Sequence, residues 1–480
     1  MSKVSEDTLH ENIQLVQDSE VKGWYSYAFA SEGYSTLLST FYPLILQQLY
    51  SEQGRDKSNH DLPCTTSCDV YFFGWMDTTT LVYYSTTTSV LLMLIIYILL
   101  GPIGDYSFYR KKLLFLFGTL NCLFGLLFLL IYNSKYYYYA TALFILGNVS
   151  FGGSFVFYYS YIPILSRYHP STIKDPDTRE EFMNNLSTFG FLYGYVGGVI
   201  VLIISIILIS VCYKFGFEGV YPMQICVGFS CLWQLIVMYS YTFPNLKERK
   251  GPELPKRPIL NSLLSLKDTL KKTRKLKELF KFLIVWFMAS DGASTISTVA
   301  ILFFQTELGV SQIGLVVVAI ISPFAAISGN YFFNLLKIKT KWTIKKILII
   351  QLIMISILPI WGMIGFFTPK NTFGLQSQWE IYPLSVYFGF VFGAAQSSCR
   401  VMFSELIPQG HESEFFGLYE LTDKGSAWIG PLVAGYIANN ANKRFTFIYL
   451  FGCFLVALGV FLLVDTEKGK RDAEDYVAQI

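Results

Sequence analysis

Long apolar stretches, separated by short polar segments, make up most of the chain from residue 23 onward. About twenty residues of α-helix, rising 1.5 Å each, are needed to cross the roughly 30 Å hydrocarbon core of a membrane. The stretches reach this length, so the pattern predicts an all-α membrane protein with about twelve transmembrane helices. The predicted spans cover residues 23–49, 79–100, 113–132, 137–164, 186–211, 217–243, 280–305, 313–336, 344–367, 381–406, 414–438 and 445–464.

A short pattern occurs twice, as Ala30–Thr36 and as Ala289–Thr295, about half the chain apart. Each copy lies in the first predicted span of one half, so the repeat indicates two pseudo-symmetric six-helix halves. Parallel repeats of this kind are related by an axis along the membrane normal. The chain is therefore predicted to consist of a tail 1–22, a half 23–243, a linker 244–279, a half 280–464 and a tail 465–480.

Each copy of the repeat places one carboxylate, Glu32 or Asp291, about 15 Å deep in its span. Acidic side chains at this depth are costly and usually functional, and here they can bind a proton or a substrate ammonium group. The alternative is that the small residues only pack the helices and each acid bonds to a neighbouring hydroxyl. The hydroxyls that can serve either role belong to Ser31, Ser35, Thr36, Ser290, Ser294 and Thr295.

Basic charge is distributed unevenly among the predicted loops. If the N-terminus is cytosolic, the even-numbered gaps between spans carry most of the loop Lys and Arg, as the positive-inside rule requires. Both termini are therefore predicted to be cytosolic. The linker contains the basic run Lys271–Lys277, which has the composition of an interfacial helix on anionic membrane lipid. The simpler interpretation is that this charge only sets the orientation.

The composition excludes several classes of protein. The chain is 53% apolar and 15% charged, with a mean hydropathy of +0.43, which is too apolar for a soluble enzyme of this length. A net charge of +3 does not indicate binding to nucleic acid. The four His lack metal-ligand spacing and there is no P-loop, so neither a metal, a cofactor nor an enzymatic activity is predicted.

The polar segment between spans two and three combines glycines, one acid and a run of bases. It resembles the Gly-x-x-x-Asp-x-x-x-Arg-Lys loop of the major facilitator superfamily. Glycines permit a tight turn, the acid can lie at a helix N-terminus, and the bases can bind acids of neighbouring loops. Such contacts would close a cytosolic gate in one state and break in the other; an ordinary turn is the alternative. The predicted gate residues are Gly101, Gly104, Asp105, Arg110 and Lys111.

Charged residues also lie inside spans ten and eleven. Arg400 and Glu420 each lie about 10 Å into their helices. A pair of Arg400 with Glu420 or with Asp423 would neutralise both members. Lys424 lies one turn from Glu420 and can pair with it on the same helix face. This intramembrane network is interpreted either as a static structural pair or as part of a moving gate.

Cys64 and Cys68 share one polar loop on the side opposite to the predicted cytosolic loops. In an oxidising lumen they would form a short disulfide, and two free thiols are the alternative. Most of the other Cys lie in predicted spans, where they act as small apolar residues.

Several runs resemble the vacuolar effluxer family of autophagy, autophagy-related protein 22, and the resemblance covers nearly the whole chain. These runs are Gly23–Ala30, Ser290–Gly292, Thr306–Gly309, Arg400–Pro408, Glu414–Tyr419 and Asp423–Ser426. The resemblance implies a major-facilitator fold in the membrane of the vacuole. It also implies export of amino acids, mainly neutral and apolar ones, to the cytosol after autophagic protein breakdown.

The residues predict a secondary transporter, and the resemblance implies that it moves neutral amino acids, driven by protons that leave an acidic lumen with the substrate. Uniport without protons stays open. One alternative is a lipid or lysolipid exporter of the same fold. Another is a transport-inactive membrane sensor or scaffold, in which the basic linker binds a cytosolic partner. The sequence identifies no protein partner.

Overall fold

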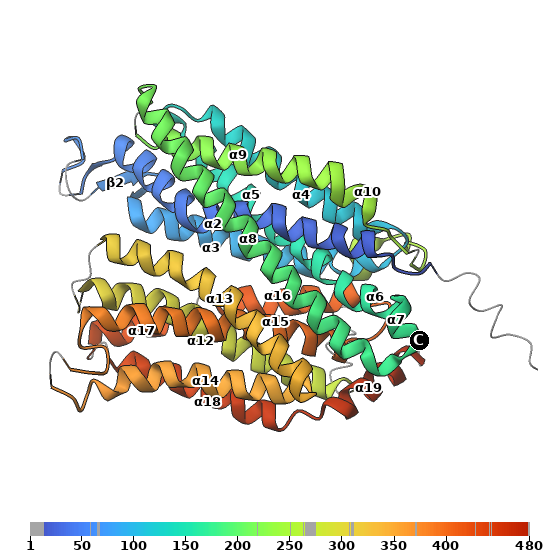
Figure 1. Ribbon diagram of the computed structural model, residues 1–480. Coiled ribbons are helices and arrows are strands. Elements are labelled where there is room, and N and C mark those ends of the chain that lie inside the picture. Colours follow the sequence, from blue (N-terminus) through green and yellow to red (C-terminus); the bar gives the residue numbers. More distant parts are fainter. Residues whose placement is uncertain are drawn as a thin grey trace, which may run out of the picture. The chain divides into compact units, whose positions relative to one another are not determined.

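The computed structural model describes residues 14–57, 59–64, 68–217, 219–249, 251–262, 264, 275–306, 308, 312–369, 372–427, 429–440, 442 and 444–478. Helices dominate these residues (Figure 1). The chain forms two compact units. The N-unit comprises Gln17–Tyr159 and Tyr193–Leu254, and the C-unit comprises residues 14–16, Ser160–Leu192 and the described part of Pro255–Ile480. The segment Ser160–Leu192 precedes the linker in sequence but packs with the helices that follow it.

In the N-unit, α4 packs against α5 and α9, α2 packs against α9, and α3 packs against α5. The helices are α2 (Asp18–Gln53), α3 (Thr78–Leu100), α4 (Tyr109–Leu127), α5 (Tyr137–Tyr159), the second part of α8 (Arg179–Lys214), α9 (Tyr221–Val237) and α10 (Phe243–Asn245). A π-helical turn, Met238–Thr242, joins the last two. The strands β1 (Arg55–Asp56), β2 (Cys68–Tyr71) and β3 (Trp75–Asp77) form an antiparallel sheet in that order.

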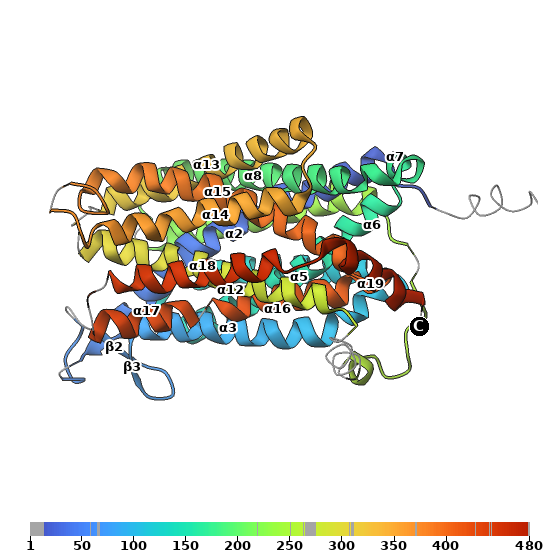
Figure 2. The same ribbon diagram turned by 90° about the horizontal axis from the view of Figure 1, so that it is seen from below.

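In the C-unit, α13 packs along α15, and α18 packs against both α12 and α14. The helices are α6 (Tyr161–Arg167), α7 (Pro170–Lys174), the first part of α8, α12 (Lys277–Thr306), α13 (Gln312–Thr340), α14 (Ile344–Ile364), α15 (Ile381–Leu406), α16 (Glu412–Ser426), α17 (Ile429–Asn440), α18 (Phe445–Leu462) and α19 (Thr466–Ala478). Figure 2 shows α16 and α17 following one another beside α12 and α18.

Among the described residues, eight helical segments are long and apolar enough to cross a membrane. They are Thr80–Asp105, Tyr109–Leu130, Ser134–Arg167, Arg179–Lys214, Tyr221–Asn245, Lys277–Ser297, Ile344–Ile364 and Phe445–Leu462. The other predicted spans fall on α2, α13, α15 and the pair α16–α17. The all-α membrane fold is confirmed, whereas the count of twelve spans stays a prediction. Most of the predicted interfacial run Lys271–Lys277 lies outside the described residues.

Glycines allow two close helix crossings. In the N-unit, a Cβ on Gly197 of α8 would lie 2.0 Å from the carbonyl oxygen of Phe29 in α2. In the C-unit, a Cβ on Gly329 of α13 would lie 1.8 Å from the carbonyl oxygen of Phe390 in α15. Small residues let backbones approach in this way in membrane proteins, where packing rather than hydrophobic burial drives helix association. The first crossing sets α8 against the helix that carries Glu32, and the second sets α13 against the helix that carries Arg400.

The segment after the last predicted span, expected only as a tail, contains helix α19. Its buried residues Gly469, Ala473 and Tyr476 follow the helical period, so one face packs against α12 and α15. Lys470 Nζ lies 3.2 Å from the carboxylate of Glu405 in α15. Burial by itself lowers the pKa of Lys470, but the carboxylates of Glu405, Glu467 and Glu180 together outweigh burial and raise the pKa of the ammonium group.

A carboxylate and a guanidinium organise the loop between α14 and α15. Glu380 is buried and accepts hydrogen bonds from the backbone N–H of residues 374–377 and from the indole of Trp361. Arg444 donates to the carbonyls of Gly362, Gly374 and Leu375. Burial by itself raises the pKa of Glu380, but the hydrogen bonds outweigh it and hold the pKa below its usual range.

Replacing Glu380 by Gln is expected to lower the stability of the C-unit by about 2 kcal/mol, because hydrogen bonds to a charged acceptor are lost. A depressed pKa contributes stability above the unfolded pKa of about 4.3, and this contribution disappears as the pH falls through the folded pKa. The difference in melting temperature between the native chain and Glu380→Gln in detergent should therefore persist from pH 7 to pH 5 and shrink below about pH 4. Glu467→Gln, at an exposed position, is the control. An equal effect of the control would contradict this role.

Candidate functional site

Asp291 lies in the middle of α12 and is 2% exposed. Its Oδ1 accepts a hydrogen bond from the backbone N–H of Gly430 at 2.8 Å, and its Oδ2 accepts one from the hydroxyl of Tyr449 at 2.9 Å. Both donors are neutral, and bonds to an ionised acceptor are strong. The carboxylate is thus held by three helices, α12, α17 and α18, all in the C-unit.

Predicted span eleven is not one continuous helix. α16 ends at Ser426 and α17 begins at Ile429, so the helix is interrupted in the middle of the predicted span 414–438. Pro431 has no backbone N–H to donate to the carbonyl of Ala427, which removes one hydrogen bond that continuity would require. The first N–H groups of α17 then need other acceptors, and Asp291 supplies one of them.

The predicted charged residues of α16 lie beside this site. The hydroxyl of Ser290 donates to Asp423 Oδ1 at 2.5 Å, and Lys424 Nζ lies 3.1 Å from Asp423 Oδ2. Asp423 is thus paired with Lys424, its neighbour in sequence. Arg400 places its guanidinium 4.3 Å from the ring centroid of Phe191. Glu420, predicted to pair with Arg400 or Lys424, is buried in the same helix as Asp423.

Glu32 occupies the corresponding position in α2 of the N-unit. It lies against the glycine face of α8, since a Cβ on Gly198 would be 3.4 Å from Glu32 Cγ and one on Gly194 would be 3.7 Å from Glu32 Cβ. The hydroxyl of Thr36 donates to the backbone carbonyl of Glu32 at 2.9 Å, and that of Ser31 donates to Ala28 at 3.5 Å. These two hydroxyls therefore bond to the backbone of their own helix.

The sequence repeat thus extends to the packing of the two acids. Each lies against a glycine of the fourth predicted span after its own: Glu32 against α8, and Asp291 against Gly430 at the start of α17. The two environments differ in one respect. α8 passes Glu32 as a continuous helix, whereas the helix that passes Asp291 is interrupted beside it.

The predicted gate loop forms a compact charged cluster in the N-unit. Asp105, 9% exposed, accepts a hydrogen bond from the Arg110 guanidinium at 2.6 Å. The turn is closed by a hydrogen bond from Gly104 N–H to Gly101 at 3.1 Å. Lys111 places its ammonium 4.3 Å from the ring centroid of Phe243.

Glu248, just after α10, completes this cluster and was missed by the sequence interpretation. Its carboxylate lies 3.6 Å from Arg110 and accepts a hydrogen bond from the backbone N–H of Lys111. The following backbone is tied to the loop by a hydrogen bond from Gly251 N–H to Ser107 at 2.8 Å. One acid within the basic run Lys247–Lys250 was the signal that could have identified this partner.

A second polar cluster joins the segment Ser160–Leu192 to the other helices of the C-unit. Two ion pairs, Arg167–Glu412 at 2.7 Å and Lys337–Glu180 at 2.8 Å, are both largely buried. Buried amides and hydroxyls add the hydrogen bonds Asn184–Asn334 at 2.6 Å and Ser187–Ser397 at 2.9 Å. The sequence interpretation named none of these residues, because the partners lie far apart in sequence.

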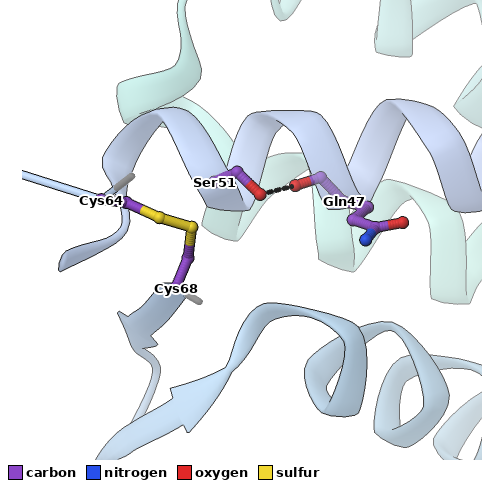
Figure 3. The surroundings of a disulfide bond; sticks show 4 residues. All are labelled: Gln47, Ser51, Cys64 and Cys68. Atoms are coloured by element: carbon purple, nitrogen blue, oxygen red, sulfur yellow. Dashed lines mark hydrogen bonds between the residues drawn. A yellow bond between two sulfur atoms is a disulfide. The ribbon is translucent and has the colours of Figure 1, made fainter. Parts of the chain in front are cut away.

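Cys64 and Cys68 form a disulfide at the start of β2, with their Cα atoms 5.2 Å apart (Figure 3). Beside it lies the end of α2, where the hydroxyl of Ser51 donates to the carbonyl of Gln47 at 2.8 Å. The disulfide thus ties Cys64, in the connection between β1 and β2, to the first residue of β2. No group of three His, Cys, Asp or Glu within the described part of the chain has the arrangement of a metal site.

The fold has close counterparts among solved structures. The major facilitator proton:xylose symporter XylE matches with a TM-score of 0.65 and 15% identity, covering 96% of this chain and 99% of that one. The major facilitator transporter FucP in its outward conformation matches with a TM-score of 0.59 and 10% identity, covering 93% of this chain and 98% of that one. The fold is therefore that of the major facilitator superfamily of membrane transporters.

The family follows from the sequence comparisons. Residues 17–474 match the family described as vacuole effluxer Atg22 like, and the chain belongs to this family. Autophagy-related protein 22 of Kluyveromyces lactis is 32% identical, covering 96% of this chain and 97% of that protein. Autophagy-related protein 22-1 of Penicillium rubens is 29% identical, covering 95% of this chain and 91% of that protein. The chain is accordingly a multi-pass membrane transporter of a vacuolar effluxer family.

Proposed function

We propose that this chain exports neutral, apolar amino acids from the vacuole lumen to the cytosol after autophagic protein breakdown, together with protons. Asp291 carries the proposal. It is a buried carboxylate in the middle of a membrane helix, held by the neutral donors Gly430 and Tyr449. A group in this position can take up a proton without breaking an ion pair, which suits it to reversible proton binding.

Glu32 is the second acid of the proposed site. It is the repeat counterpart of Asp291, and its side chain packs against Gly194 and Gly198 of α8. Ser35 and Ser294 hold equivalent positions in the repeat, and with the other repeat hydroxyls they are proposed to provide neutral hydrogen bonds to the substrate. We assign proton transfer to Glu32 and Asp291, and substrate contacts to hydroxyl and backbone groups.

Both termini are proposed to be cytosolic, as the loop charge predicts. On this orientation, the cluster of Asp105, Arg110 and Glu248 lies at the cytosolic end of the N-unit. The contacts of Ser160–Leu192 lie at the cytosolic end of the C-unit. We propose that both sets belong to the closed state of a cytosolic gate, because bistable polar contacts of this kind let a transporter alternate between two states.

Counterflow exchange in proteoliposomes tests the proposed substrate class. Vesicles that contain the full-length chain are loaded with unlabelled leucine and exposed to labelled leucine, arginine, glutamate or a lysolipid. We expect exchange of leucine and much less of the charged amino acids. Exchange of the lysolipid without exchange of leucine would contradict the proposal and support a lipid exporter.

Replacing Asp105 by Ala is expected to remove the closer acidic contact of Arg110, a side chain that is only 6% exposed. The carboxylate of Glu248 stays near the guanidinium, at 3.6 Å. Breaking a buried ion pair on one side costs about 3–5 kcal/mol, so the closed cytosolic gate should be weakened. The measurement is the rate of leucine exchange, together with the accessibility of a single cysteine placed near the loop to a cytosolic reagent. Lys112→Ala is the control, since it changes the charge of the same loop. An unchanged rate and accessibility would favour the ordinary-turn interpretation.

A further inference from the structure

The N-terminus of α17 is built to bind a carboxylate inside the membrane. α17 has 12 residues, and its first turn lies within predicted span eleven, where water is scarce. The free N–H groups of a helix N-terminus and the helix dipole favour a negative charge there. In the structure, the carboxylate of Asp291 accepts a hydrogen bond from the N–H of Gly430 at 2.8 Å.

The hydroxyl of Thr295 points toward the N-terminus of α17 and makes no hydrogen bond with the described residues. Thr295, one turn after Asp291 on α12, is 0% exposed. Its Oγ1 has no hydrogen-bond partner among the residues that the structure describes. It faces Gly430 so closely that a Cβ added to this glycine would lie 1.6 Å from Oγ1. A buried hydroxyl without a partner is costly, so its position against the helix end indicates a ligand that it can bind.

We propose that the α17 N-terminus binds the carboxylate group of the transported amino acid, and that Asp291 occupies this site while no substrate is bound. This inference rests on the proposed function and assigns the substrate carboxylate to the N–H of Gly430 and the hydroxyl of Thr295. Protonation makes Asp291 a weaker acceptor, and the substrate carboxylate then takes over its donors. Proton binding and substrate binding are thereby linked, because two carboxylates compete for one set of donors.

The groups around Asp291 are compatible with this exchange. From α18, the neutral hydroxyl of Tyr449 donates to the carboxylate, and Cys453, one turn further along the helix, is a buried free thiol. From α16, Asp423 contacts the adjacent Ser290 and is paired with Lys424. The charged side chains of α15 and α19 contact groups other than Asp291. Arg400 of α15 lies against Phe191, and Lys470 of α19 lies against Glu405. Among these contacts, no cation pairs directly with Asp291, so its charge can be lost at modest cost.

Binding of labelled leucine to the purified full-length chain at pH 5.5 and pH 7.5 tests the inference. We expect leucine to bind more tightly at pH 5.5. N-acetyl-leucine, which keeps the carboxylate, should compete, whereas leucinamide, which lacks it, should not. Asp291→Asn mimics the protonated acid and is expected to bind leucine equally at both pH values.

Thr295→Val keeps the shape of the side chain and removes the hydroxyl, so leucine binding should weaken about tenfold. The matched control is Thr340→Val, whose hydroxyl donates to the carbonyl of Leu336 in its own helix at 2.7 Å. Competition by leucinamide as strong as that by N-acetyl-leucine, or equal binding by the two valine variants, would overturn the carboxylate site while leaving amino-acid transport intact. Absence of leucine binding to the native chain would overturn the proposed function and this inference with it.

Discussion

The double variant Glu32→Gln and Asp291→Asn is expected to abolish the response of leucine transport to a pH gradient. Both substitutions keep the shape of the side chain and remove its charge. In the native chain, a gradient of one pH unit is equivalent to about 1.4 kcal/mol and can sustain about tenfold accumulation at one proton per leucine. The double variant should only equilibrate leucine across the membrane. The measurement is the steady-state concentration of labelled leucine in proteoliposomes.

Two single variants separate the roles of the acids. If a carboxylate carries the coupling proton, its neutral variant should lose the gradient response and keep counterflow exchange. If it holds the substrate ammonium, both activities should fall, because loss of a charge-assisted contact weakens binding about ten- to a hundredfold. Glu52→Gln at an exposed position of α2 is the matched control. Gradient-driven accumulation by the double variant at the native level would contradict the acidic-site mechanism.

The same variants discriminate the sensor or scaffold alternative. A sensor that binds a cytosolic partner through the linker should depend on the basic charges of the run Lys271–Lys277. A transporter should depend on Glu32 and Asp291. Neutralising the linker bases while the acids are intact is therefore expected to leave leucine exchange unchanged.

A crosslink between Asn184→Cys and Asn334→Cys is expected to stop transport almost completely and reversibly. The two amide groups are 2.6 Å apart and buried, on α8 and α13. If Ser160–Leu192 must leave these helices when the cytosolic gate opens, a covalent bond there holds the gate closed. The measurement is leucine exchange before and after oxidation, and again after reduction, in a chain whose buried free cysteines are replaced by alanine.

A crosslink inside the N-unit is the matched control. Ser26 and Thr242, whose hydroxyl oxygens lie 2.7 Å apart on α2 and the π-helical turn, take no part in the proposed gate contacts, so a bond between cysteines at these positions should leave transport intact. Equal inhibition by both crosslinks would show that general rigidity, not the gate, limits transport. Full activity with Asn184→Cys and Asn334→Cys crosslinked would contradict the gating role of this segment.

The membrane fold could be predicted because hydrocarbon imposes a simple length and composition on every helix. The repeat could be recognised because Glu32 and Asp291 lie in nearly identical local sequences. The length of an apolar stretch and the likeness of two short segments can each be read from neighbouring residues, without knowledge of contacts between distant parts of the chain. The assignment of the two acids to one shared site stays a prediction.

The features that sequence reasoning missed depend on contacts between distant segments. Pro431 could have signalled an interruption of span eleven, which was predicted as continuous, but only the structure places Asp291, Tyr449 and Thr295 around it. Glu248 was indistinguishable from a solvated linker acid until its contact with Arg110 was seen. Pairing inside a membrane bundle is decided by the packing of helices, which hydropathy does not specify.

Accumulation of labelled leucine against its gradient is the most direct test of proton-coupled amino-acid export. Proteoliposomes with the full-length chain are diluted into acidic buffer, so that protons flow inward. We expect leucine to accumulate above its external concentration, accumulation to collapse when a protonophore is added, and no accumulation to occur without the pH gradient. Leucine uptake that stops at equilibrium and is the same with and without the gradient would contradict the account.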